Sequence, residues 1–304
     1  MVTPSGEQFE IRAAGYRAVI TEAGASLRVL EYDGRALVDG FPDSESCSGG
    51  RGQLLMPWAG RIQDGSFTFG DRACQLPLSE PALRNASHGL VRWVSWTVEE
   101  HTGHSVSLVY RLPAQPGYPW SLDLHVSYDL SADGLTVTQT ATNLADSPAP
   151  YACGAHPYLA VGEGPIDTWE LTLPASRRTL VDERLLPVGS EPVDDTDYDF
   201  RIARPIKDTV FNDAFTELDR DEYGHAAVVL EGDRDGLTLW VDESVRWLQV
   251  FSGDALPYGA RRAIAIEPMT AQANAFRTGE DLVTLAPSGE PGDDLSVSWG
   301  IRVN

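Results

Sequence analysis

Hydrophobic and polar residues alternate along much of the chain, and a period of two is typical of strands that bury one face. Residues 105–112 alternate cleanly, and residues 121–130 and 135–143 do so on either side of an Ala-Asp-Gly turn. Val, Ile, Thr, Tyr and Trp are common in these segments, which strengthens the prediction of strands. Further strands are expected at residues 16–20, 26–32, 35–39, 236–242, 245–251, 262–267 and 295–303.

Helical periodicity is scarce by comparison. Short helices are expected at most near residues 274–277 or 281–285, and residues 186–199, rich in Pro and Asp, predict a long surface loop. Many strands joined by short turns favour an all-β sandwich or barrel. Because no repeat of 20–50 residues and no linker interrupts the pattern, we expect residues 1–304 to form a single domain.

The net charge of the chain limits the classes of molecule that it is expected to bind. The chain carries 45 acidic and 23 basic residues, a formal net charge of −22. Such a field repels nucleic acid and anionic membranes. No apolar run approaches the roughly 18 residues of a membrane span, and residues 1–13 lack the apolar centre of a secretory signal. We therefore expect a cytoplasmic protein that binds neither nucleic acid nor membrane.

Several kinds of chemistry are disfavoured. The three cysteines, Cys47, Cys74 and Cys153, are odd in number and far apart, which predicts buried thiols rather than a disulfide framework or a zinc site. Lys207 is the only lysine, so a Schiff base could form nowhere else. There is no Gly-rich phosphate loop and no G-x-S-x-G turn. The sequence therefore predicts neither a cofactor nor a metal.

Three segments place an ionisable residue beside an apolar run and next to Gly or Pro: residues 57–62 with 87–90, residues 154–159, and residues 264–270. Glu267 follows Ala-Ile-Ala-Ile, where burial is unfavourable for a carboxylate unless another group pairs with it. Arg61 is the natural candidate partner, and a purely structural ion pair is the alternative. His88 and His156, taken singly, are equally consistent with hydrogen-bonded turn residues.

Taken together, these segments resemble the aldose 1-epimerase, or galactose mutarotase-like, family over essentially the whole chain. The matching elements occur in the family's order: Arg61-Ile62, Gly65 to Phe67, His88-Gly89, His156-Pro157-Tyr158, Phe211-Asn212-Asp213-Ala214-Phe215 and Glu267-Pro268. The resemblance implies a large antiparallel β-sandwich with an open cleft that binds a small sugar, as a monomer or homodimer. It also implies ring opening and closure of an aldohexose without a cofactor.

By the same resemblance, Glu267 is expected to be the general base, His156 the general acid and His88 a second histidine near the ring oxygen. Arg61 and Asp213 are expected to position the substrate, and Arg61 is also a candidate to orient Glu267. Trp58 and Tyr158 offer apolar faces for a sugar ring, although wall packing is an equal alternative. Since a histidine's pKa is ordinarily about 6.5, we expect neighbouring carboxylates to keep the acid protonated.

The sequence also departs from the family's pattern and leaves alternatives open. Gly60 stands where family members often have Asn, and Leu90 follows His88-Gly89 where a second Gly is common, which leaves the sugar undefined. One alternative is epimerisation of a sugar 6-phosphate. Others are a hydrolase or lyase that uses Asp213 and Glu267 as paired carboxylates, and a non-catalytic sugar sensor. The phosphate alternative would need basic residues near the site, for which four are available: Arg61, Arg92, Arg261 and Arg262.

Overall fold

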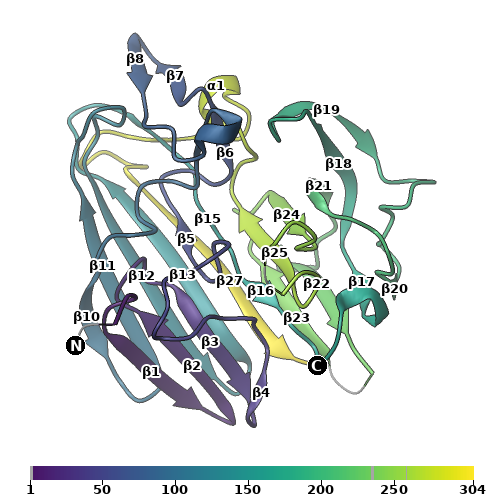
Figure 1. Ribbon diagram of the computed structural model, residues 1–304. Coiled ribbons are helices and arrows are strands. Elements are labelled where there is room, and N and C mark those ends of the chain that lie inside the picture. The colour runs from purple at the N-terminus through teal and green to yellow at the C-terminus, as the bar shows by residue number, and fades with distance from the viewer. Residues whose placement is uncertain (1–2, 234–235, 258) are drawn as a thin grey trace.

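Two large antiparallel sheets dominate the molecule (Figure 1). The computed structural model describes residues 3–233, 236–257 and 259–304. The first sheet has nine strands in the order β10-β11-β12-β13-β27-β23-β22-β17-β20. Its strands are β10 (Thr97–His101), β11 (Ser105–Leu112), β12 (Leu122–Ser131), β13 (Gly134–Asn143), β17 (Glu170–Thr172), β20 (Arg204–Pro205), β22 (Ala226–Glu231), β23 (Gly236–Val241) and β27 (Asp294–Val303).

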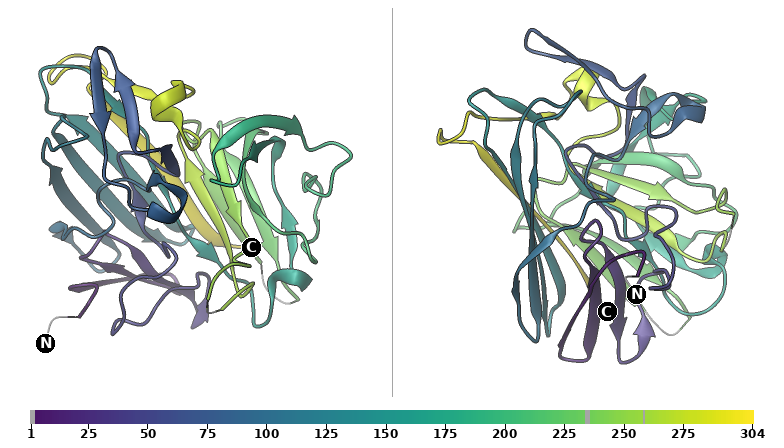
Figure 2. Two further views of the ribbon diagram at one scale, coloured as in Figure 1. Left: turned by 45° about the horizontal axis from the view of Figure 1, so that its top comes forward. Right: turned by 60° about the vertical axis from the view of Figure 1, so that its left-hand side comes forward.

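The second sheet has eight strands, in the order β19-β18-β21-β24-β25-β15-β5, with β16 paired to β25 beside β15. The two views of Figure 2 show this sheet lying against one side of the nine-stranded sheet. Its strands are β5 (Leu54–Leu55), β15 (Gly154–Ala155), β16 (Tyr158–Leu159), β18 (Ala175–Val181), β19 (Pro187–Pro192), β21 (Asn212–Leu218), β24 (Trp247–Phe251) and β25 (Ile264–Met269).

Smaller elements complete the fold. A four-stranded sheet forms from β1 (Gln8–Ala13), β2 (Tyr16–Thr21), β3 (Leu27–Tyr32) and β4 (Arg35–Ala36). Two-stranded sheets pair β6 (Arg61–Gln63) with β9 (Asn85–Ser87), β7 (Ser66–Phe69) with β8 (Arg72–Gln75), and β14 (Ala149–Tyr151) with β26 (Val283–Leu285). The described helices are short: η1 (Pro81–Leu83), η2 (Ile166–Thr168) and α1 (Ala275–Thr278).

The period-two pattern decides which side chains enter the core. Along β25, Ile264 and Ile266 are buried in the main hydrophobic cluster, and along β24 Leu248 and Val250 join the same cluster. The intervening residues face the other side of the eight-stranded sheet. This alternation confirms the prediction of an all-β antiparallel sandwich, and it leaves one sheet face available for polar groups.

Most expected strands are present within two or three residues of their predicted limits, including the long β12–β13 hairpin. Two expectations are wrong. Residues 281–285 form no helix, because β26 pairs there with β14. Residues 186–199 are only partly a loop, since β19 extends along the edge of the eight-stranded sheet beside β18. This six-residue edge strand begins and ends in Pro and has little hydrophobic alternation, so the pattern misses it.

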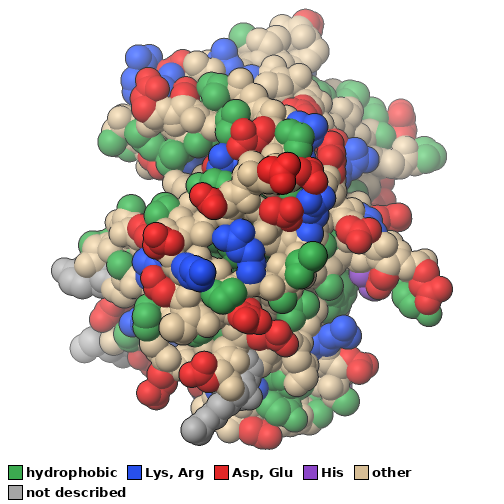
Figure 3. Space-filling view, turned by 90° about the vertical axis from the view of Figure 1, so that its right-hand side faces the viewer, with side chains coloured by type: hydrophobic (Ala, Val, Ile, Leu, Met, Phe, Trp, Pro, Cys, Tyr) green, Lys and Arg blue, Asp and Glu red, His purple; other side chains and the backbone are tan. Residues whose placement is uncertain are grey.

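No described helix is long or apolar enough to cross a membrane. Residues 1–2 of the polar N-terminal stretch lie outside the described residues. On the face shown in Figure 3, acidic side chains are widely spread with basic ones beside them.

Candidate active site

A cavity of about 370 Å³ lies on the face of the eight-stranded sheet that does not pack in the main core. Strands of the sheet form its floor, and loops that follow or precede short strands form its walls. The ionisable and amide side chains that line it are Arg61, Glu80, His88, His156, Tyr158, Asn212, Gln249, Glu267 and Gln272.

Strand register builds the floor. Gln249 on β24 is paired in register with Glu267 on β25, and on its other side with Ala214 on β21. Because residues directly opposite in an antiparallel sheet share a face, all three point into the cavity. Two residues further along the strands, on the same face, Asn212 lies opposite Phe251, and the Gln249 amide donates a 3.3 Å hydrogen bond to Asn212 Oδ1.

Glu267 is the most deeply buried acid of the site, with a relative exposure of 3%. Its Oε1 lies 3.3 Å from His156 Nε2, and its Oε2 has no hydrogen-bond partner. Burial raises the pKa of Glu267 to about 8, and the positive charge of Arg61 offsets that rise only in part. The cavity therefore favours the protonated carboxylic acid at neutral pH.

His156 lies in the connection between β15 and β16, where backbone hydrogen bonds to Gln53 and Gly52 hold it on both sides. Its ring stacks on Tyr158 at 5.0 Å between centroids and 13° between planes. Burial lowers the pKa of His156 to about 3. This is the opposite of the expectation that neighbouring carboxylates keep it charged. Its neighbour Glu267 is itself protonated, so desolvation of the imidazolium dominates.

His88 follows β9 and approaches His156 edge to face, with ring centroids 5.6 Å apart. Burial, followed by the charge of His156, lowers the pKa of His88 well below its ordinary value. Its backbone is left-handed, with φ 59°, as is that of Gly89. A Cβ at Gly89 would lie 2.0 Å from the carbonyl oxygen of Met56, so the chain passes too closely here for any other residue.

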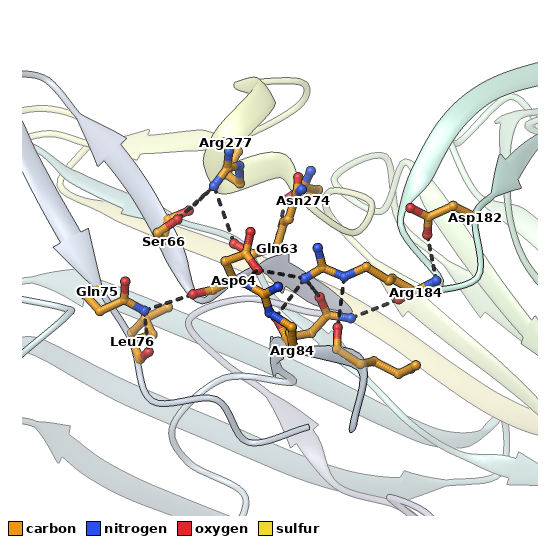
Figure 4. A network of polar contacts seen from close by, with 12 residues as sticks. Gln63, Asp64, Ser66, Gln75, Leu76, Arg84, Asp182, Arg184, Asn274 and Arg277 are labelled. Carbon is orange, nitrogen blue, oxygen red and sulfur yellow. Dashed lines mark hydrogen bonds and ion pairs between the residues drawn. The ribbon is translucent and has the colours of Figure 1, made fainter. Parts of the chain in front are cut away.

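The wall of the cavity beside His88, formed around β6 and β9, is held in place by side-chain contacts rather than by a long ladder of backbone hydrogen bonds. Arg61, the first residue of β6, forms a two-pronged ion pair with Glu80: Nε lies 2.7 Å from Oε2 and Nη2 lies 3.0 Å from Oε1. Arg184, in the β18–β19 loop, donates to the carbonyl oxygens of Leu83 and Arg84 (Figure 4). That loop also lines the cavity through Leu185, so Arg184 joins two walls.

Comparison with known proteins now places this site in a family. Residues 7–293 match the family model described as aldose 1-epimerase. The chain belongs to the aldose 1-epimerase family. It is 34% identical over 289 residues to the protein YihR of Escherichia coli K12, an uncharacterized protein, and the match covers 94% of this chain and 91% of YihR.

Solved structures show the same fold. A GalM/aldose epimerase homologue from C. elegans has a TM-score of 0.85 at 20% identity, covering 97% of this chain and 98% of that one. A galactose 1-epimerase from Lactobacillus acidophilus NCFM has a TM-score of 0.79 at 21% identity, covering 96% and 92%. At these identities the likeness establishes the galactose mutarotase-like fold of this family member, whereas the sugar has to be inferred from its own cavity.

Seven residues of this epimerase-family member were expected at the site. Five of them line the cavity together: Arg61, His88, His156, Tyr158 and Glu267. Arg61 does lie beside the site, but its hydrogen bonds go to Glu80 and not to Glu267. Tyr158 lines the cavity through its ring, and its hydroxyl donates to Gly49 O at 2.8 Å.

Trp58 and Asp213 are not brought to the cavity. Trp58 is buried in the main core, where its ring meets Phe276 edge to face at 5.8 Å. Asp213 points to the same side of β21 as Phe211 and Phe215, with its Oδ1 3.6 Å from Arg178 Nη1. The sequence itself indicates this placement. Because side chains alternate between the faces of a strand, Asp213 shares a face with the apolar residues Phe211 and Phe215, and Asn212 lies on the opposite face.

Sequence reasoning also missed Glu80 and Gln249. Gln249 could have been found from the alternation of residues 247–251, in which the residues on either side of it are Leu and Val. Glu80 lies in a polar loop 19 positions from Arg61, and nothing in its local pattern marks it.

By residue type, His88, His156 and Glu267 could also hold a cation, since one ligand atom from each lies within 4.8 Å of the others. A metal-bound histidine, however, almost always donates its other ring N–H to a supporting acceptor. Nδ1 of His88 and Nδ1 of His156 are both buried without a hydrogen-bond partner. These residues therefore fit proton transfer better than metal ligation, and independence from a metal stays a prediction.

Proposed function

We propose that this chain is an aldose 1-epimerase that interconverts the α and β anomers of a free aldohexose such as glucose or galactose. The observation that carries the proposal is the buried contact of an acid with a histidine, Glu267 Oε1 and His156 Nε2 at 3.3 Å, on the floor of a sugar-sized cavity. A cytoplasmic location and the absence of macromolecular partners stay predictions.

The chemistry needs one base and one acid near a single carbon. Opening of the ring removes the proton of the C1 hydroxyl and delivers a proton to the ring oxygen, and both oxygens are attached to C1. Glu267 accepts the first proton and His156 delivers the second, as each group acts in general acid–base catalysis. After rotation about the C1–C2 bond, the two transfers run backwards and close the ring on its other face.

The number of protons agrees with this scheme. In the reactive state Glu267 is a carboxylate and His156 is an imidazolium, so the pair holds one transferable proton, on His156. Opening converts them into a carboxylic acid and a neutral imidazole, again with one proton between them. Because burial raises the pKa of Glu267 and lowers the pKa of His156, the cavity favours the second arrangement. Burial therefore assists the ring-opening step, which is the step that neutralises both groups.

The other candidate functions receive less support. A hydrolase that uses Asp213 and Glu267 as a pair is disfavoured, because the two side chains lie on opposite faces of their sheet. For a sugar 6-phosphate, three of the four arginines considered above are absent from the described cavity lining. Arg261 pairs with Asp167 and Asp254, and Arg262 pairs with Asp39.

The test is polarimetry on freshly dissolved α-glucose and α-galactose. We expect the purified protein to accelerate the approach to the anomeric equilibrium above the rate in buffer. A panel of other aldoses extends the assay, and release of reducing ends from oligosaccharides would reveal a hydrolase instead. A protein that binds sugars but accelerates no aldose in the panel would be a sensor.

A further inference from the structure

The ion pair between Arg61 and Glu80 lies at the edge of the cavity, and both side chains line it. The two parallel contacts, at 2.7 Å and 3.0 Å, are the geometry in which a guanidinium binds a carboxylate most strongly. The side chains are 18% and 28% exposed. The pair is therefore partly desolvated, and each charge is largely satisfied by the other.

The backbone on both sides of this pair is fixed. The N–H of Glu80 donates to the carbonyl of Asn85 at 3.0 Å, and the N–H of Asn85 donates back to Glu80 at 3.1 Å. Arg61 lies opposite Ser87 in the β6–β9 ladder, and its carbonyl accepts from the N–H of Asn274 at 2.6 Å. Glu80 thus belongs to the same small unit as Arg61 and is held in reach of it.

This pairing decides the charge that a ligand meets. Arg61 is the only Lys or Arg among the cavity-lining residues that the structure describes, while Glu80 and Glu267 are acids. Nearby Arg51 is turned to Asp39, with Nε 3.0 Å from Oδ2. A phosphate or carboxylate on a sugar would enter a partly buried site whose single lining guanidinium is already neutralised, and an unpaired buried anion is strongly disfavoured.

We propose that Glu80 is a specificity-determining residue, which neutralises Arg61 and so restricts the cavity to uncharged aldoses. This inference rests on the proposed function, since it names the substrate class of the same site. Glu80 takes two of the five N–H groups of the guanidinium, which leaves Arg61 further donors and Glu80 further lone pairs. Side by side, these donors and acceptors suit two neighbouring sugar hydroxyls, each of which both donates and accepts.

The experiment compares ligands that differ only in charge at C6. Methyl β-glucoside and methyl β-glucuronide bind without reacting, because neither has a free C1 hydroxyl, and calorimetry gives their affinities. In the unaltered protein, we expect the glucoside to bind at least about tenfold more tightly. Glu80→Gln releases Arg61, and the ratio should shift toward the glucuronide by roughly 10- to 100-fold, the range for one hydrogen bond to a charged group.

Arg61→Gln has the opposite expected effect and protects the test if Glu80→Gln does not fold. It leaves the Glu80 carboxylate uncompensated, so discrimination against the glucuronide should widen. Asp123→Asn is the matched control, because Asp123 forms a similar two-pronged pair with Arg111 at 3.1 Å, exposed and away from the cavity. It changes the net charge as Glu80→Gln does and should leave the ratio unchanged.

The inference is overturned if the unaltered protein binds both ligands equally, or if Glu80→Gln moves the ratio no further than Asp123→Asn does. Turnover is measured separately, with glucose and glucuronic acid in the polarimeter. Selective binding of the glucoside without any acceleration would sink the proposed function and leave the inference standing. Acceleration of both free sugars alike would support the function and overturn the inference.

Discussion

The floor and the wall of the cavity are built in different ways. On the floor, the cavity side chains of β24 and β25 are placed by strand register, with Gln249 opposite Glu267. On the wall, the β6–β9 ladder covers only three residue pairs, and the segment depends on side-chain contacts. Arg184 donates to Asp64 and Asn85 as well as to backbone carbonyls, and the Asn85 amide donates back to Arg184 O at 2.9 Å (Figure 4).

The difference separates two kinds of contribution to catalysis. A side chain placed by strand register is held rigidly, because many backbone hydrogen bonds would have to break before it could shift. Such a position suits a group whose reacting atom must lie at a fixed place. A side-chain-built wall can vary with few substitutions, and it suits the recognition of different sugars. Substitutions on the floor should therefore act mainly on kcat, and substitutions on the wall mainly on KM.

The largest expected effect is that of Glu267→Gln on the floor. The amide is nearly isosteric but cannot accept the C1 proton as a carboxylate does, so kcat should fall by at least about 10²–10⁴-fold. Polarimetry measures the loss, and circular dichroism checks that the fold is intact. Near-normal turnover in a folded variant would remove Glu267 from the mechanism.

The two histidines test the comparison directly, because His156 lies against the floor and His88 on the wall. His156→Asn should lower kcat by about 10²-fold or more, as expected for loss of a general acid. His88→Asn should raise KM and lower kcat less. The kinetic constants of both folded variants decide the matter. A far greater loss of kcat in His88→Asn would reverse the assignment and make His88 the acid.

The pH profile is the next effect in size. Between the lowered pKa of His156, about 3, and the raised pKa of Glu267, about 8, the pair retains one proton. Turnover needs that proton, so kcat/KM should stay level near neutral pH and fall about tenfold per pH unit above about 8. A fall that begins near pH 6.5 would instead indicate a histidine with an ordinary pKa.

Stability gives an independent check of the same pKa. Above its ordinary value of 4.5, the carboxyl of Glu267 ionises in the unfolded chain but stays protonated in the folded one up to about 8. The unfolded state then binds fewer protons, so the free energy of unfolding falls as pH rises through this window, by about 1.4 kcal/mol per pH unit. Glu267→Gln has no carboxyl to ionise at this position, so its free energy of unfolding lacks this pH-dependent fall. The difference in Tm between the variant and the unaltered protein should therefore shift in favour of the variant from pH 5 to pH 8.

The smallest effect is expected from Arg184→Met on the wall. The substitution leaves four acceptors without their donor, which should cost about 1–3 kcal/mol of stability. It should raise KM several-fold with little change in kcat, because the floor is untouched. Arg177→Met is the control, since Arg177 lies on β18 of the same hairpin in an exposed pair with Glu217. Equal changes in both variants would show that Arg184 does not act on the cavity.

The strands of the floor were largely predictable from the sequence, and the side-chain contacts that build the wall were not. Alternation places Ile264, Ile266 and Glu267 correctly on β25, because burial on one face constrains every second residue. The same rule, applied strictly, would have selected Asn212 rather than Asp213. The pairing of Arg61 with Glu80 depends on how a loop folds back on β6, and composition carries no record of that geometry.

One feature of the first sheet bears on how the protein is made. Strand β27, residues 294–303, lies between β13 and β23, which the ribosome releases more than 150 and about 50 residues earlier. Until β27 emerges, the edges of β13 and β23 that it later covers stay unpaired, and such edges can pair with other chains. Expression yield should therefore depend on chaperones that shield growing chains, even though the mature sheet joins these strands without a gap.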